Sequence, residues 1–219
     1  MVTREQGRAG GDGRTSRGPR RAAREPVLGP APGRLELVRS FINTLDIEAG
    51  TDELDSSAAL AAWLREGQLT GSGQARASED DLRQAIAIRE ALRDVISAHV
   101  GSRDAAPAPL AELRSAAAGL GTRLDIGDDG AVLTVPAGED VRAGLAALLL
   151  IASEAATLGT WSRLKACSAD DCRWAFYDRS PTRNGCWCSM AVCGSRAKSR
   201  AYRQRARRSG GSGQDAASW

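Results

Sequence analysis

The residues that most catalytic sites require are scarce in this sequence. It contains one histidine, His99, and aromatic residues make up 4% of its 219 residues. Neither a serine–histidine–acid set nor paired carboxylates beside a nucleophile can be assembled from it. Gly7, Gly10 and Gly11 do not form a phosphate loop, because no strand precedes them and no helix follows. We therefore expect no enzyme, and we expect His99 to be a helix-end residue rather than a ligand.

An apolar segment that could serve as a secretory signal or a membrane span is also missing. Residues 1–32 are rich in Arg, Gly and Pro and hold almost no large apolar side chain, so we expect a disordered leader. Residues 141–158 are apolar nearly all round, but Arg142 and Glu154 interrupt the run and it is too short to span a bilayer. We expect a cytoplasmic protein without a membrane partner, whose cysteines stay reduced.

The low aromatic content, with Ala, Leu, Arg and Gly dominant, favours helices over a large sheet. Apolar residues recur at helical spacing from Leu35 to Leu45, and a second helix is predicted after an N-cap at Ser56 or Ser57. Ser78 and the acids after it, a close relative of the capping box, begin a long amphipathic helix. Further helices are predicted over 110–118 and, after Asp140, over 141–158, with a β-hairpin at 122–135 around a Gly-Asp-Asp-Gly turn.

Acidic residues are absent from residues 194–208, and this segment is strongly basic. Its positive charge alone exceeds the formal net charge of +3 of the whole chain, which implies a polyanionic partner. Four of its arginines follow one another at spacings of four, three and four residues, which places them on one face of a helix. We expect this stripe to contact duplex DNA through phosphates and guanine edges, with a solvated charged face as the alternative. The candidate contacts are Arg196, Lys198, Arg200, Arg203, Arg205, Arg207 and Arg208.

Four of the five cysteines form two pairs, each with four residues between its members. The pairs are Cys167 with Cys172 and Cys188 with Cys193. Thiolates kept together in a reducing compartment are typical metal ligands, and zinc is the usual occupant of a four-cysteine cage. Disulfides and ordinary buried thiols are the alternatives. The fifth, Cys186, is expected to be a thiol near the surface, although it could compete for the metal or trap an oxidised Cys188.

The cysteines belong to a longer motif that resembles the CGNR-type zinc finger, a small treble-clef-like module of bacterial proteins. The motif reads Cys167-x4-Cys172-x-Trp174-x-Phe176-x-Asp178-x-Ser180, then Trp187-Cys188-Ser189-Met190-x2-Cys193-Gly194-Ser195-Arg196-x-Lys198. The resemblance implies that the four cysteines bind one Zn²⁺ per chain and that the module binds DNA. Ser195 stands in place of the asparagine that gives the family its name, and Cys186 stands where the family usually has a basic residue.

The preceding helical region resembles the ABATE family, described as stress-induced transcription regulators, which commonly precedes CGNR fingers. The resemblance covers about residues 34–165 and is carried by the segments 41–46, 60–64 and 88–93. It implies a helical domain that senses an effector or dimerises. The polar residues Asn43, Thr44 and Asp46 in the first of these segments are expected to cap a helix end, which is what such side chains do by default.

The predicted fold is mainly α, with a small β-hairpin. We expect a disordered leader (1–32), a helical domain (33–165), a four-cysteine finger with a basic helix (166–208) and a disordered tail (209–219). Zinc should hold Trp174, Phe176 and Trp187 around a small core, with the basic helix starting near Ser189. The predicted function is a zinc-dependent, DNA-binding transcription regulator, nucleoid-associated if it binds DNA. An RNA-binding module and a thiol or zinc redox-sensing adaptor are the alternatives.

Overall fold

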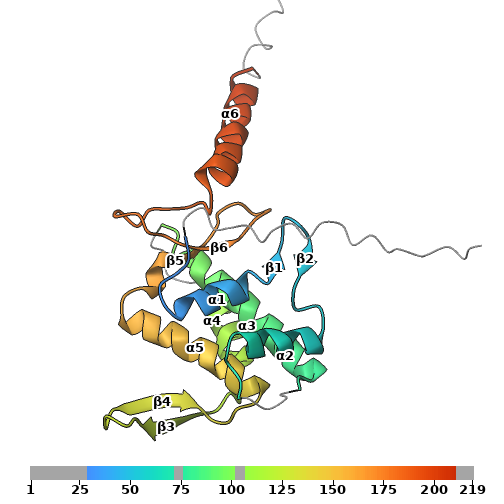
Figure 1. Ribbon diagram of the computed structural model, residues 1–219. Helices are drawn as coiled ribbons and strands as arrows, with labels where there is room; N and C mark the ends of the chain where they lie inside the picture. Colours follow the sequence, from blue (N-terminus) through green and yellow to red (C-terminus); the bar gives the residue numbers. More distant parts are fainter. Residues whose placement is uncertain (1–28, 72–75, 102–106, 211–219) are drawn as a thin grey trace, which may run out of the picture.

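The computed structural model describes residues 29–71, 76–101 and 107–210 (Figure 1); the predicted leader and tail fall largely outside them. About half of the described residues are helical, and the strands among them form three separate antiparallel pairs. This confirms the predicted fold class. The helices are α1 (Leu35–Ile42), α2 (Ser57–Glu66), α3 (Glu79–Ala98), α4 (Pro107–Ala116), α5 (Val141–Thr157) and α6 (Ser195–Gly210). The strand pairs are β1 (Leu45–Asp46) with β2 (Thr51–Asp52), β3 (Thr122–Ile126) with β4 (Val132–Pro136), and β5 (Leu164–Ala166) with β6 (Ala175–Tyr177).

Helices α1 to α5 form a helical body whose core lies between α1, α2, α3 and α5. Phe41, Leu64, Ile88 and Leu148 are fully buried there. As predicted, α5 is a central helix, and the Asp140 carboxylate accepts a hydrogen bond from the Ala143 amide at 2.8 Å to cap its first turn. Among the described residues, no helix is long and apolar enough to cross a membrane.

The capping box at the start of α3 is confirmed. The Asp81 amide donates to the Ser78 hydroxyl at 3.1 Å, and the Ser78 amide donates to the Asp81 carboxylate at 2.8 Å. The N-cap of α2 is Ser56, one of the two predicted residues. The hairpin β3–β4 forms where it was predicted, with Leu124 opposite Thr134.

Several details of the structure differ from the prediction. Helix α1 ends at Ile42, so Leu45 lies in strand β1 instead of extending the helix's apolar stripe. Helix α4 begins at Pro107, three residues before the predicted Leu110, because proline is tolerated in the first turn of a helix. The described packing extends to Ala31, which is buried and precedes the expected start of the folded region.

Asn43, the C-cap residue of α1, binds strand β6 through its side chain. The Asn43 side-chain amide donates to the Ala175 carbonyl at 2.8 Å, and the Ala175 amide donates back to the Asn43 side-chain oxygen at 2.8 Å. These bonds join residues 132 positions apart, and both residues are buried. The Asn43 side chain therefore hydrogen-bonds the backbone of β6 as the backbone of a neighbouring strand would.

Helix α3 provides a second connection through the buried Arg93. Its guanidinium donates to the carbonyl oxygens of Ile42 at 2.6 Å and Arg173 at 3.0 Å, and to the Glu90 carboxylate at 3.0 Å. Arg173 in turn forms an ion pair with Asp94 of α3. A buried guanidinium is stable only when its donors are satisfied, so Arg93 holds α1, α3 and the segment before β6 in one arrangement.

We predict that Asn43→Ala lowers the free energy of unfolding by about 2 kcal/mol or more, because it leaves the buried amide and carbonyl of Ala175 without partners. Urea unfolding of the wild-type protein and of Asn43→Ala measures this difference. The control is Asn184→Ala, which removes an exposed side chain bonded to Thr182. Equal stability of the two variants would show that the Asn43 bridge contributes nothing.

Candidate metal centre and basic helix

The chain after α5 forms a cysteine module, residues 164–210, built on the short pair β5–β6. Cys167 follows β5, and its amide donates to the Trp174 carbonyl at 3.0 Å, which closes the loop that carries Cys172. Cys188 comes after the loop that follows β6. Cys193 lies in η2 (Met190–Gly194), a single π-helical turn that begins with an N-cap at Ser189 and leads directly into α6. Sequence reasoning placed the start of the helix near Ser189, as the structure shows, but it did not predict β5.

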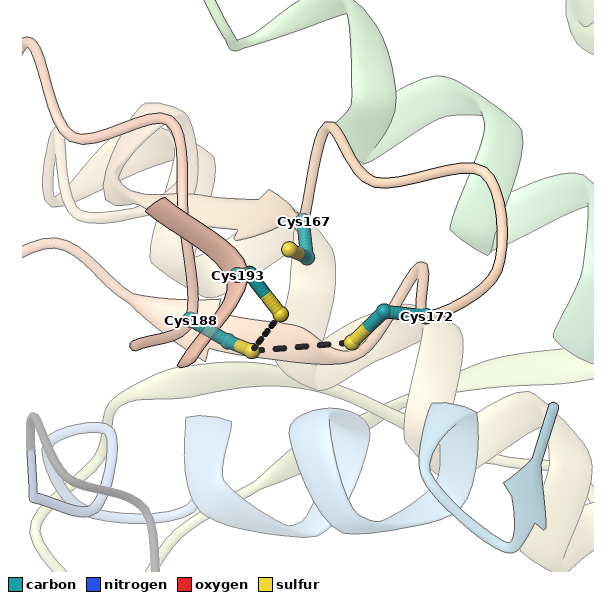
Figure 2. Close-up of side chains that lie close together, drawn as sticks. All are labelled: Cys167, Cys172, Cys188 and Cys193. Atoms are coloured by element: carbon teal, nitrogen blue, oxygen red, sulfur yellow. Dashed lines mark hydrogen bonds between the residues drawn. The ribbon is translucent and has the colours of Figure 1, made fainter. Parts of the chain in front are cut away.

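The four cysteine sulfurs gather in one small space. All lie within 4.8 Å of one another, and all four residues are buried. Cys188 Sγ lies 3.6 Å from Cys172 Sγ and 3.8 Å from Cys193 Sγ, and Figure 2 shows the side chains turned toward one another. Disulfide sulfurs are about 2.05 Å apart, so these contacts are not disulfides.

This geometry fits a tetrahedral metal ion. Zinc–thiolate bonds of about 2.3 Å in a tetrahedron place the sulfurs about 3.8 Å apart, close to the two distances found here. The four cysteines are therefore positioned to bind one metal ion, and a site made only of sulfur favours zinc over the harder divalent ions.

The electrostatics of the cluster also favour a bound cation. Hydrogen bonds from Cys172 and Cys188 lower the pKa of Cys167, whereas burial, together with repulsion from its thiolate neighbours, raises the pKa of Cys193 to about 12. Four buried thiols cannot all ionise side by side without compensating positive charge. A bound divalent cation supplies that charge and links the four chain segments.

A small apolar core surrounds the sulfurs. Phe176 and Ala169 are buried against them, and Trp174 and Trp187 pack at the edge, as the sequence predicted for the three aromatic residues. A core of this size does not hold a fold by hydrophobic burial alone, so the module depends on the metal and on its contacts with the helical body.

A buried ion pair fixes the loop between β6 and Cys188. Lys165 Nζ donates to Asp178 Oδ2 at 2.9 Å and to the carbonyl oxygens of Arg183 at 2.5 Å and Gly185 at 3.3 Å. Burial opposes the ionisation of Asp178, but hydrogen bonds from Ser180 and Lys165 outweigh it and hold the pKa of Asp178 well below its usual range. The amide of Ser180 donates to Asp178 Oδ1 at 2.9 Å, which closes a turn after β6. Sequence reasoning missed Lys165.

Cys186 and Ser195, the two departures from the finger motif, have separate local roles. Cys186 is partly exposed, and its thiol donates to the Asn184 carbonyl at 3.2 Å. It is not a member of the four-sulfur cluster. The Ser195 hydroxyl donates to the Met190 carbonyl at 3.2 Å and so closes the π-helical turn.

The polar residues of the helical region act as structural groups. His99 caps the end of α3; its Nδ1 donates to the Leu164 carbonyl at 2.7 Å, and burial lowers its pKa. Thr44 donates to the Phe41 carbonyl at 2.8 Å, the predicted helix-end bond. Asp46 does not cap a helix as expected; it lies in β1 and accepts from the Ala49 amide at 3.0 Å within the β1–β2 turn. Asn43 does more than cap, because it binds β6.

Helix α6 extends away from the helical body (Figure 1) and contains no acidic residue. Lys198, Arg200, Arg203, Arg205 and Arg207 are exposed on it, whereas the side chain of Arg208 lies outside the described part of the chain. Arg196, near the start of the helix, forms an ion pair with Glu48 of the β1–β2 turn at 2.8 Å. A shallow groove of about 590 Å³ runs beside the helix between η2 and Arg203.

We predict one zinc ion per chain in reduced protein, measured by elemental analysis. Cys172→Ala and Cys188→Ala should each lose the metal, because three thiolates bind zinc less tightly than four. Cys186→Ser is the matched control, since it removes a cysteine outside the cluster, and it should keep one zinc per chain. Zinc-free wild-type protein prepared under reducing conditions would overturn the assignment.

We also predict that Asp178→Asn lowers the free energy of unfolding by about 3 to 5 kcal/mol, because it leaves the buried Lys165 ammonium without its counter-charge. The comparison is Asp80→Asn, which breaks an exposed ion pair with Arg83 and should cost less than about 1 kcal/mol. Chemical unfolding of both variants gives the two values. Similar losses of unfolding free energy in the two variants would show that the buried Lys165–Asp178 pair stabilises the protein no more than the exposed Asp80–Arg83 pair does.

Comparison with known families agrees with these observations. Residues 163–206 match the model of the CGNR zinc finger, and residues 35–160 match the ABATE model, described as "Putative stress-induced transcription regulator". No curated protein matches the chain. Both families are regulatory or zinc-finger families rather than enzyme families. Since the ABATE match alone covers more than half of the 219 residues, the chain belongs to the ABATE family and carries a CGNR zinc finger after the family's helical region.

Proposed function

We propose that the protein is a transcription regulator that binds duplex DNA through α6. The observation that supports this most directly is the position of the basic helix, which extends from the body with the arginines from Arg196 to Arg207 exposed. An arginine stripe about three turns long can lie along a DNA groove, neutralise phosphates and release counterions. The proposed contacts are Arg196, Lys198, Arg200, Arg203, Arg205, Arg207 and Arg208.

The composition of α6 favours a polyanion as its partner. The helix is polar all round, with Tyr202 as its one large apolar side chain, so packing contributes little to its stability. Repulsion between neighbouring arginines opposes the helix further. Phosphates placed along the stripe offset that repulsion, so nucleic acid should stabilise α6 while the helix binds it.

The proposed task of the cysteine cluster is to fix the direction of α6. Cys193 lies in the turn directly before the helix, and the Ser195–Met190 hydrogen bond closes the same turn. Zinc bound to Cys167, Cys172, Cys188 and Cys193 would tie this turn to the loops around β5 and β6. The chain's own contacts then connect these strands to the helical body through Asn43 and Arg93.

The helical body would sense an effector or dimerise. Two of its surfaces suit such roles. An open pocket of about 940 Å³ lies between β4 and α5 and is lined by polar and apolar residues in nearly equal measure, with Leu133, Ala147 and Ile151 among the apolar ones. The outer face of the hairpin exposes Leu124 and Ile126, 71% and 65% accessible.

We predict that Arg203→Ala and Arg207→Ala each weaken binding to duplex DNA by about the same factor whatever the DNA sequence. Each should also reduce the slope of log K against the logarithm of the salt concentration by about 0.9. Fluorescence anisotropy over a series of salt concentrations measures both effects. Arg83→Ala removes an exposed arginine from α3 and should change neither.

Competition at fixed salt between the duplex and a structured RNA of equal length separates DNA from RNA as the partner. Tighter binding to the RNA would overturn the assignment of duplex DNA. Wild-type protein that binds neither would overturn the nucleic-acid function itself.

A further inference from the structure

Two acidic side chains lie at the inner end of α6, the end nearest the body. Arg196 Nη2 lies 2.8 Å from Glu48 Oε1, and its Nη1 lies 4.0 Å from Asp171 Oδ2. Arg200 Nη1 lies 3.9 Å from the same Asp171 oxygen. The inner half of the basic stripe is therefore already in contact with carboxylates when no nucleic acid is bound.

The outer half of the stripe differs. Within the part of the chain that the structure describes, Arg203 and Arg207 have no acidic partner, and both side chains are exposed. A polyanion that approaches α6 thus meets uncompensated positive charge on the outer turns first. It meets the inner arginines only after it competes with Glu48 and Asp171.

Competition at the inner arginines is physically reasonable because these ion pairs are solvent-accessible. The side chains of Arg196 and Glu48 are 42% and 22% exposed, and those of Arg200 and Asp171 are 44% and 55% exposed. Exposed pairs are weak and are screened by salt, whereas guanidinium–phosphate contacts are often bidentate and are reinforced by counterion release. A phosphate can displace these carboxylates, but their negative charge stays nearby and repels the phosphate.

We propose that Glu48 and Asp171 act as electrostatic competitors of the nucleic-acid backbone for Arg196 and Arg200, and that they limit the affinity of α6. This inference rests on the proposed function, since it concerns the same basic helix. Glu48 belongs to the ABATE region and Asp171 to the finger, so the helical body contributes directly to the strength of binding.

The position of Glu48 depends on helix α3. The turn that carries Glu48 connects β1 to β2, and Asp52 of β2 accepts two hydrogen bonds from the buried Arg89 of α3, at 2.7 and 2.9 Å. A rearrangement of α3 would therefore move the β1–β2 turn and change how strongly Glu48 competes. Through the Glu48–Arg196 contact, a structural change in the helical body would alter the DNA affinity of α6, although the body itself does not bind the DNA.

The test uses Glu48→Gln, Asp171→Asn and the double variant of the full-length protein, with random-sequence duplex DNA as the probe. Each single variant should bind roughly threefold more tightly than wild type and the double variant roughly tenfold, with a steeper salt dependence, because the inner arginines can then neutralise phosphates without competition. Asp125→Asn is the matched control. It also removes one negative charge and one exposed ion pair, with Arg123, but on the hairpin at the end of the molecule opposite α6 (Figure 1).

The outcomes separate this inference from the proposed function. If wild type binds the duplex and Glu48→Gln gains no more affinity than Asp125→Asn, the competition is wrong and the DNA-binding function stands. Weaker binding by Glu48→Gln would also overturn it, because the contact would then position α6. If neither wild type nor the double variant binds, both proposals fail. Because Asp171 directly precedes Cys172, the zinc content of each variant is measured as well. If Asp171→Asn loses zinc, the DNA affinity of Glu48→Gln alone decides between the outcomes.

Discussion

Four buried sulfurs that cannot all ionise without a cation are the constraint on which the cysteine module depends. Cys167, Cys172, Cys188 and Cys193 come from four different segments and meet within 4.8 Å. The apolar residues around them are too few to hold these segments together, so metal binding and folding of the module are coupled. Because Cys193 lies in the turn that starts α6, the same coupling fixes where the basic helix begins.

The module is attached to the helical body by polar contacts, each with its partners satisfied. Asn43 provides both a donor and an acceptor to the backbone of Ala175, and Arg93 distributes its donors between the end of α1 and the segment before β6. Such contacts are directional, and they are costly to break when buried. The ABATE region and the finger therefore hold a defined orientation, which a regulator needs if an event in one part is to affect the other.

Local patterns in the sequence predicted the elements that depend on local physics. The Ser78 capping box, the Asp140 cap, the hairpin around Gly-Asp-Asp-Gly and the spacing within each of the two cysteine pairs each lie within a few residues of chain and were found. Contacts between distant segments were not found, because neither hydrophobic periodicity nor capping chemistry encodes them. The bridge from Asn43 to Ala175 spans 132 positions, and the Lys165–Asp178 and Glu48–Arg196 pairs link residues that carry no motif in common. One signal was available: Arg89 and Arg93 are spaced four residues apart among the apolar positions of α3, where an exposed arginine is not expected.

The central claim is that one metal ion bound by four thiolates organises the module that carries α6. X-ray absorption at the zinc edge of the full-length, reduced protein tests it most directly, because it reports the number, type and distance of the atoms bound to the metal. Four sulfur neighbours at about 2.3 Å, with no nitrogen or oxygen neighbour, is the predicted result. A spectrum with fewer sulfurs, or with nitrogen or oxygen in the first coordination sphere, would contradict the four-cysteine site.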